Sequence, residues 1–180
     1  MKVETPTITV SNRQRARKIN LPLLRRIAAA LLSDLQIADA ALEINLLGAA
    51  QMARLNETFL RHAGPTDVIT FDYAKRAGRF PGPSQVPGKR GGDRRRAARV
   101  LRGEIFVCVD EAVRQARTFR TRWQSELVRY IVHGVLHLTG HDDGGAAARR
   151  VMKRAEDRGL RGLARRFSLA EIDAAFKLRP

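Results

Sequence analysis

The sequence predicts an α/β (α+β) protein in which a small mixed four-stranded sheet packs with about five or six helices, as a single domain over residues 1–180. Strand-like segments with a two-residue alternation are separated along the chain by segments in which apolar residues recur at helical spacing. At 180 residues the chain is long enough to bury one apolar core. Its composition, 44% hydrophobic and 29% charged residues, is that of a globular protein.

Strand and helix signals alternate through the first half of the chain. A short strand is expected around Ile8 and Val10. Asn20 suits the N-cap of a helix and Pro22 its first turn, and apolar residues recur at helical spacing as far as Leu35. ALEINLLG (41–48) alternates like a strand, the stretch 48–60 is rich in Ala, Met and Leu and suits a helix, and the β-branched TDVITFDY (66–73) suits a largely buried strand.

The second half is expected to be mainly helical after one more buried strand, GEIFVCV (103–109). Helices are expected at 111–119 and at 123–139. In the second of these Leu127, Ile131 and Val135 share one side, and Gly140 ends the helix. A further helix runs from 146 to about 166, and Ser168 with Glu171 forms a capping-box pattern that starts a short last helix.

Residues 74–102 have a composition that cannot pack a core. They include five glycines, three prolines and ten basic residues, with Asp93 as the only acid. We therefore expect a mobile basic loop within the domain. It is either a harmless insertion or a contact for RNA, and in the second case the contacting residues are Lys89, Arg90, Arg94, Arg95 and Arg96.

The charge of the chain favours a polyanionic partner. Lys and Arg number 34 against 18 Asp and Glu, a formal net charge of +16 at pH 7, so binding to RNA is expected; a GC-rich genome that favours arginine is the alternative explanation. The single Cys108 allows neither an intrachain disulfide nor a cysteine zinc site. Because no secretory signal or long uncharged apolar run occurs, we expect a cytoplasmic protein without membrane contact.

The stretch HGVLHLTGHDD, residues 133–143, contains the candidate metal-binding residues of the chain. His133 and His137 are four apart, so a helix projects both rings from one face, close enough to share an ion. Gly140 then ends the helix and lets the chain turn back, which brings Asp143 or His141 toward the same point. Histidines at this spacing are often plain surface or core residues, but a third histidine, two adjacent aspartates and the glycine favour a metal site.

Two imidazole nitrogens and one carboxylate leave the fourth position of a tetrahedral zinc ion open to water, as in a catalytic site. Zinc lowers the pKa of its bound water to about 7 and so provides hydroxide at neutral pH. The zinc peptidase pattern H-E-x-x-H places a glutamate after the first histidine, where this chain has Gly134. We therefore expect a metal-dependent hydrolase other than a peptidase, with one Zn2+ per chain; nickel or manganese would also suit these ligands.

Three blocks, HGVLHLTGHDD, GEIFVCVDEAVRQA and LNETFLRHAGPTDVITF, together resemble the YbeY family of bacterial metal-dependent endoribonucleases. They occur in the family's order and span most of residues 55–143, with a weaker echo at Met152 and Glu156. The resemblance implies a single-strand-specific ribonuclease that acts in small-subunit rRNA maturation and ribosome quality control. It also implies zinc held by His133 and His137.

The chain departs from the family pattern at two places. The family commonly has G-Y-D-H where this chain has Gly140, His141, Asp142 and Asp143, so the register favours Asp143 as third ligand, with His141 as the alternative. The family arginine that follows the aromatic residue of the LN block is replaced by Leu60, and Arg61 lies one position later. One residue turns a helix by about 100°, so Arg61 does not simply take the place of the family arginine, and His62 is a second candidate for that role. Asp67 is either catalytic or a turn carboxylate.

The expected function is a zinc-dependent endoribonuclease, a hydrolase of phosphodiester bonds, that acts in 16S rRNA 3′-end maturation and ribosome quality control. His133, His137, Asp143 and Arg61 are the expected catalytic residues. Arg61 and the basic loop would hold the RNA, in small-subunit rRNA or on the ribosome, without DNA specificity. The alternative is a non-catalytic rRNA-binding assembly factor whose metal is structural and fully coordinated.

Overall fold

The structure is a computed structural model that describes residues 6–60, 64–74 and 100–175. Its strands are β1 (Thr7–Asn12), β2 (Asp39–Leu47), β3 (Val68–Asp72) and β4 (Val100–Cys108). They form one four-stranded sheet in the order β1-β2-β4-β3. The first three strands in that order are parallel, and β3 pairs antiparallel with β4 at the edge. The mixed four-stranded sheet expected from the sequence is confirmed.

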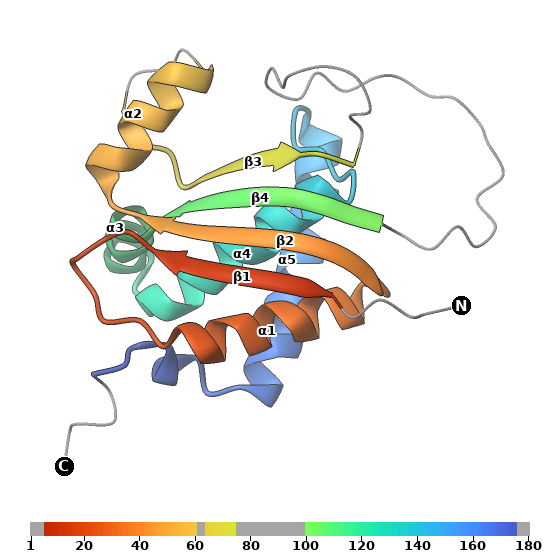
Figure 1. The fold of residues 1–180 in the computed structure, drawn as a ribbon. Coiled ribbons are helices and arrows are strands. Elements are labelled where there is room, and N and C mark those ends of the chain that lie inside the picture. Colours follow the sequence, from red (N-terminus) through yellow and green to blue (C-terminus); the bar gives the residue numbers. More distant parts are fainter. Residues whose placement is uncertain (1–5, 61–63, 75–99, 176–180) are drawn as a thin grey trace, which may run out of the picture.

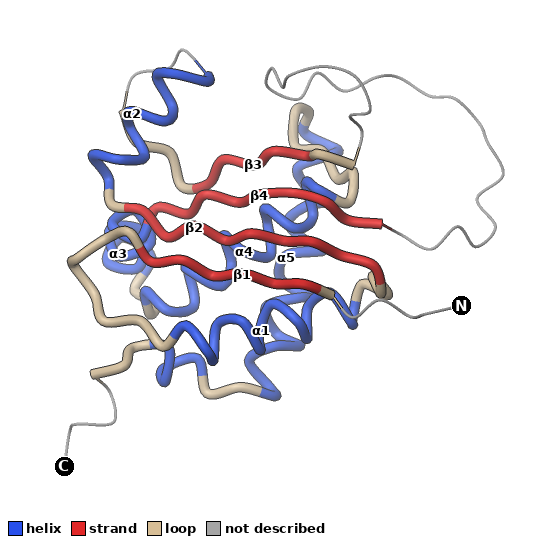
Figure 2. The backbone as a smooth tube through the Cα atoms, in the orientation of Figure 1, coloured by secondary structure: helices blue, strands red, loops and turns tan. Residues whose placement is uncertain are grey.

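Helices form a second layer on one face of this sheet. In Figure 1, α4 (Trp123–Leu138) and α5 (Ala146–Arg166) lie behind the strands, α1 (Leu21–Asp34) runs below β1, and α2 (Ala49–Leu60) stands at one end. α3 (Val109–Phe119) directly follows β4, and a 3-10 turn, η1 (Leu169–Ile172), follows α5. The two layers are also clear in the tube view of Figure 2. Five α-helices in the described part of the chain agree with the expected number.

α1 starts where the local signals place it. Asn20 caps α1, because its Oδ1 accepts a hydrogen bond of 3.2 Å from the Leu23 backbone N–H, and proline occupies the first turn.

None of the described helices is both long and apolar enough to span a membrane.

The main core lies between α1, α4 and the inner face of the sheet. Leu24 and Ile27 of α1, Ile44 of β2, Ile105 of β4 and Leu127 of α4 are completely buried there. Each such side chain contributes about 1.5–3 kcal/mol when it leaves water. This packing fixes α4 against the sheet, and α4 carries the two histidines.

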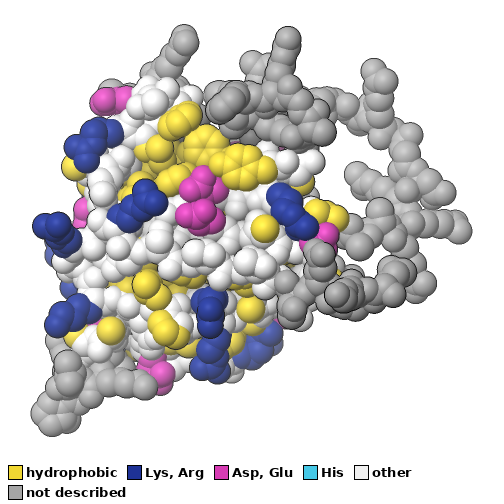
Figure 3. Space-filling view, viewed as in Figure 1, with side chains coloured by type: hydrophobic (Ala, Val, Ile, Leu, Met, Phe, Trp, Pro, Cys, Tyr) yellow, Lys and Arg dark blue, Asp and Glu magenta, His cyan; other side chains and the backbone are white. Residues whose placement is uncertain are grey.

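The other face of the sheet is polar at its centre and apolar toward β3. Glu43 of β2 and Glu104 of β4 are register partners there, and Phe71 of β3 makes edge-on ring contacts with Phe59 and Phe106. Figure 3 views this face and shows acidic side chains beside an apolar patch. Burial raises the pKa of the Glu104 carboxyl, opposed by a hydrogen bond from Tyr73, and the nearby charge of Glu43 raises it further.

Four expectations differ from the structure. β4 begins at Val100 and not at 103, because residues 100–102, of which Val100 and Leu101 are apolar, pair with Asp39–Ala41 of β2. The expected basic loop at 74–102 is therefore wrong for 100–102, and its residues 75–99 lie outside the described part. β3 is an edge strand in which only Ile69 is buried. Ser168 makes no side-chain cap hydrogen bond, and the element after it is a 3-10 turn.

Candidate metal centre

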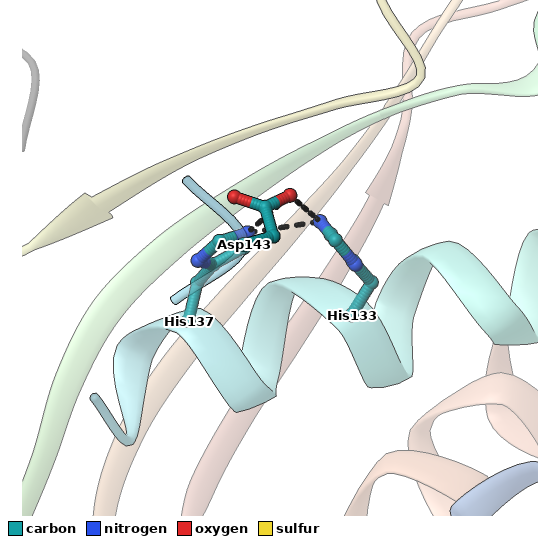
Figure 4. A group of neighbouring side chains, drawn as sticks. All are labelled: His133, His137 and Asp143. Atoms are coloured by element: carbon teal, nitrogen blue, oxygen red, sulfur yellow. Dashed lines mark hydrogen bonds and ion pairs between the residues drawn. The ribbon is translucent and has the colours of Figure 1, made fainter. Parts of the chain in front are cut away.

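α4 presents His133 and His137 on the same side, one helical turn apart. Their Nε2 atoms are 2.9 Å from each other, and the two ring centroids are 4.5 Å apart in an edge-on arrangement. Figure 4 shows both rings rising from α4 toward one point. The helical spacing therefore produces the pair of nitrogen donors expected from the sequence.

The chain after α4 turns back because of Gly140. Gly140 adopts a φ of +91°, in the left-handed region that glycine enters without strain. The His141 N–H then donates to the Leu136 carbonyl at 3.0 Å, and the Gly140 N–H donates to the His137 carbonyl at 2.9 Å. This pair of bonds is a Schellman motif, which closes the helix and reverses the chain. The reversal carries Asp143 over the histidines.

Asp143 completes a three-atom cluster with the two rings (Figure 4). Its Oδ2 lies 3.9 Å from Nε2 of His133 and 3.8 Å from Nε2 of His137. The point equidistant from the three atoms is about 2.1 Å from each, within the range of about 2.0–2.2 Å for zinc bonded to imidazole nitrogen or carboxylate oxygen. Among the described residues these three could hold a metal ion together.

Hydrogen bonds on the far side of each ring fix which nitrogen faces the cluster. Nδ1 of His133 donates to Oε1 of Glu156 at 2.6 Å, and Nδ1 of His137 donates to the His141 carbonyl at 3.1 Å. A carbonyl oxygen and an ionised carboxylate only accept, so each neutral ring carries its proton on Nδ1. Two Nε2 lone pairs then face each other at 2.9 Å, an arrangement that a cation stabilises.

The pKa values of the two histidines are shifted in opposite directions. Burial disfavours the charged form of His133, but the hydrogen bond and charge of Glu156, with the charges of Asp67 and Asp143, raise the pKa of His133 above its ordinary value. Burial and the neighbouring charge of His133 lower the pKa of His137. Beyond the Nδ1 protons of the two neutral rings, the pair therefore takes up one further proton readily and a second one poorly. This is expected of two bases that share one site.

Glu156 belongs to a charged network between α4 and α5. Its side chain is only 10% exposed, and its Oε2 lies 3.7 Å from Arg129 and 3.9 Å from Lys153. Arg129 also pairs with Asp157 at 2.7 Å. Burial opposes ionisation of Glu156, but the hydrogen bond from His133 lowers the pKa of its carboxyl below the usual range. The sequence pointed to Glu156 only as an echo of the family; its signal is an acid within the apolar stripe of α5, between Met152 and Leu163.

Gly134 has a packing role between the histidines. A Cβ built there would lie 2.8 Å from Cγ2 and 3.0 Å from Cδ1 of Ile105 on β4. α4 can therefore approach the sheet this closely only with glycine at this position. The glutamate of the peptidase pattern has no room here.

The other candidate residues fall outside the cluster or outside the described residues. The ring of His141 points its Nδ1 to the Thr139 hydroxyl at 3.3 Å, and only its backbone carbonyl contacts His137. Asp67 accepts hydrogen bonds from the Val68 N–H at 2.9 Å and from the Thr66 hydroxyl at 3.1 Å, as a turn carboxylate does. The described residues do not include Arg61, His62, Lys89, Arg90, Arg94, Arg95 and Arg96.

Comparison with known proteins shows the family of this chain. The family model described as Endoribonuclease YbeY matches residues 9–164. The chain belongs to the YbeY family. Endoribonuclease YbeY of Geobacter metallireducens is 31% identical over 147 residues, which cover 80% of this chain and 87% of that protein. Endoribonuclease YbeY of Syntrophotalea carbinolica is 28% identical over 174 residues, 96% of this chain and 95% of that one.

A solved structure shares the YbeY fold described here. The solution structure of a protein from Thermotoga maritima matches with a TM-score of 0.56 and 22% sequence identity, and the match covers 87% of this chain and 89% of that one. At this identity the likeness shows the fold alone. It agrees with the mixed sheet and helices of this YbeY family member.

Proposed function

We propose that this chain is a single-strand-specific, metal-dependent endoribonuclease that acts in 16S rRNA 3′-end maturation and in ribosome quality control. Membership of the YbeY family supports an endoribonuclease, a hydrolase with an RNA substrate. In this proposal residues 1–180 form one domain that works in the cytoplasm. Its partner is small-subunit rRNA or the ribosome, without DNA specificity.

In this proposal one Zn2+ per chain is held by His133, His137 and Asp143. The observation that supports this proposal is that Nε2 of His133, Nε2 of His137 and Oδ2 of Asp143 lie at bonding distance from a common point. The side chain of Asp143 is 44% exposed. An exposed ligand on the outer side of the cluster leaves room for a phosphate, whereas a structural zinc site is closed by a fourth protein ligand. Nitrogen and oxygen donors suit zinc, and nickel or manganese also.

The residues of the site have separate tasks in the proposed reaction. His133 and His137 supply the nitrogen donors, and Glu156 and the His141 carbonyl hold their rings in the required tautomer. A divalent ion bound there supplies Lewis acidity to a phosphoryl oxygen and lowers the pKa of water. Arg61 and the basic residues Lys89, Arg90, Arg94, Arg95 and Arg96 are proposed to hold the RNA strand and to offset its charge.

The proposal is tested by cleavage of labelled RNA. A single-stranded fragment with a 16S 3′-end sequence, and the same fragment annealed to its complement, are incubated with protein purified free of contaminating nucleases. We expect the single strand to be cut, cutting to stop with a chelator and to return with Zn2+, and the His133→Ala, His137→Ala variant to be inactive. Equal cutting by that variant would exclude the enzyme and leave the non-catalytic assembly factor with a structural metal.

A further inference from the structure

α5 has an uneven distribution of charge around its axis. Its 21 residues include eight Lys and Arg and only two acids, Glu156 and Asp157. Both acids bond to residues of α4, Glu156 to His133 and Asp157 to Arg129. Asp157 lies at one edge of the solvent side and is already paired with Arg129 and Lys153, so the rest of that side has basic residues without acids among them.

Five arginines form a stripe along that solvent side. Arg150, Arg154, Arg158, Arg161 and Arg165 are spaced by three or four residues, so at about 100° per residue they fall within an arc of about 80°. The buried Met152 and Leu163 lie on the opposite side of the helix. All five arginines are exposed, and none has a carboxylate partner within the described part of the chain. We call these five residues the arginine stripe.

The arginine stripe is unfavourable for the helix itself. Like charges three or four residues apart each destabilise a helix by about 0.2–0.5 kcal/mol. The first turn of α5 has no acidic residue, and Arg149 and Arg150 lie near its positive end. A bound polyanion would remove this repulsion, whereas water and salt only screen it.

The stripe begins in the first turns of α5, which follow the turn that carries Asp143. Arg149 Nη1 donates to the Asp143 carbonyl at 3.2 Å, so the first turn of α5 is tied to the ligand turn. A hollow in the surface here is lined by Ala146, Arg149, Arg150, Lys153 and Arg154. From Arg150 the stripe then extends over about 22 Å, at about 1.5 Å per residue. The basic surface is thus continuous from the ligand turn to the end of α5.

We propose that the arginine stripe binds the phosphate backbone of single-stranded RNA and guides the strand to the metal centre. This inference rests on the proposed function, because it assigns a substrate path to the same site. Guanidinium groups match phosphate oxygens with two parallel hydrogen bonds. One helical turn separates successive arginines by about 5–6 Å, so the stripe presents a row of such groups to one extended strand.

The test compares two triple variants of equal charge. Arg154→Gln, Arg158→Gln, Arg161→Gln removes the middle of the stripe. The control, Arg25→Gln, Arg117→Gln, Arg122→Gln, removes three exposed arginines of α1, α3 and the start of α4. RNA affinity is measured by fluorescence anisotropy with a labelled single strand, across a range of salt concentrations. A His133→Ala background prevents cutting in this measurement, and cleavage is measured on the wild-type background.

We expect the stripe variant to bind RNA roughly tenfold more weakly than the control, or worse. Its slope of log affinity against log salt should be shallower by about 2, because each contact to a single strand contributes about 0.7. In cleavage, KM should rise while kcat at saturating RNA stays near the wild-type value. Removal of like charges should leave the melting temperature at or above that of the wild type, so misfolding does not account for the loss.

Separate outcomes overturn the inference and the proposed function. If the wild type cuts RNA and both triple variants bind it equally well, the inference is wrong and the proposed function stands; the stripe would then suit an acidic protein surface. If RNA affinity depends on the stripe but metal-loaded protein does not cut, the stripe still binds RNA and the proposed function is wrong.

Discussion

At the scale of single residues, the site depends on hydrogen bonds that face away from it. Nδ1 of His133 and Nδ1 of His137 are both used as donors, to Glu156 and to the His141 carbonyl. Each ring is thereby held with its Nε2 lone pair toward Asp143. A buried carboxylate behind a ligand histidine also makes the ring a stronger electron donor.

Glu156→Gln should weaken Zn2+ binding by about 10–100-fold, because glutamine keeps the size of the side chain but loses the charge behind His133. The pH dependence should change as well. Glu156 raises the pKa of His133, so in the wild type protons compete with the metal from a pH above the ordinary histidine pKa of about 6.5. In the variant this competition should begin at lower pH. Calorimetric titrations between pH 5.5 and 8 measure both effects.

Asp157→Asn is the matched control for this substitution. Asp157 is the neighbouring acid on α5 and bonds to Arg129, but it makes no contact with His133. We expect its Zn2+ affinity and pH profile to stay near those of the wild type. If both variants lost affinity equally, Glu156 would act through the stability of α5 and not through the ring of His133.

At the scale of elements, the close contact between α4 and β4 sets the position of the histidines. Gly134→Ala should destabilise the fold, because the new methyl group would overlap Ile105. Overpacking costs about 1–3 kcal/mol, more than the gain of up to about 1 kcal/mol from the helix propensity of alanine. Urea unfolding measures the change in the free energy of unfolding.

Gly162→Ala in α5 is the control for that prediction. A Cβ there would meet only Asp34 Oδ2, at 4.0 Å. This variant should therefore be neutral or more stable, through helix propensity alone. Equal effects of the two substitutions would show that the close packing of α4 on Ile105 is not what requires glycine at 134.

Local sequence signals are sufficient to predict part of the structure at this scale. The spacing of His133 and His137 and the helix-ending Gly140 predict the histidine-bearing helix α4 and its return turn. Other features depend on contacts between distant segments: Glu156 meets His133 because α5 packs on α4, 23 residues later in the chain. Residues 100–102 are extended because β2 offers them hydrogen bonds, although they directly follow a Gly-, Pro- and Arg-rich stretch that suits a loop.

At the scale of the whole molecule, metal binding and folding should be linked. The three proposed ligands come from α4 and from the turn that follows it, so an ion that binds all three is bound by the folded chain and not by the unfolded one. An excess of Zn2+ at about 100 times its dissociation constant should stabilise the fold by about 2.7 kcal/mol. Thermal melting with chelator and with Zn2+ should show this difference in the wild type. The His133→Ala, His137→Ala variant should melt at the same temperature in both.

The central claim is that Asp143, with His133 and His137, binds one metal ion. Calorimetric titration of Zn2+ into metal-free wild type, Asp143→Ala and His141→Ala tests it most directly, because His141→Ala keeps the backbone carbonyl that supports His137. We predict one ion per chain for the wild type, an unchanged affinity for His141→Ala and a clearly weakened one for Asp143→Ala. Binding that is lost in His141→Ala and kept in Asp143→Ala, or no saturable binding by the wild type, would contradict it.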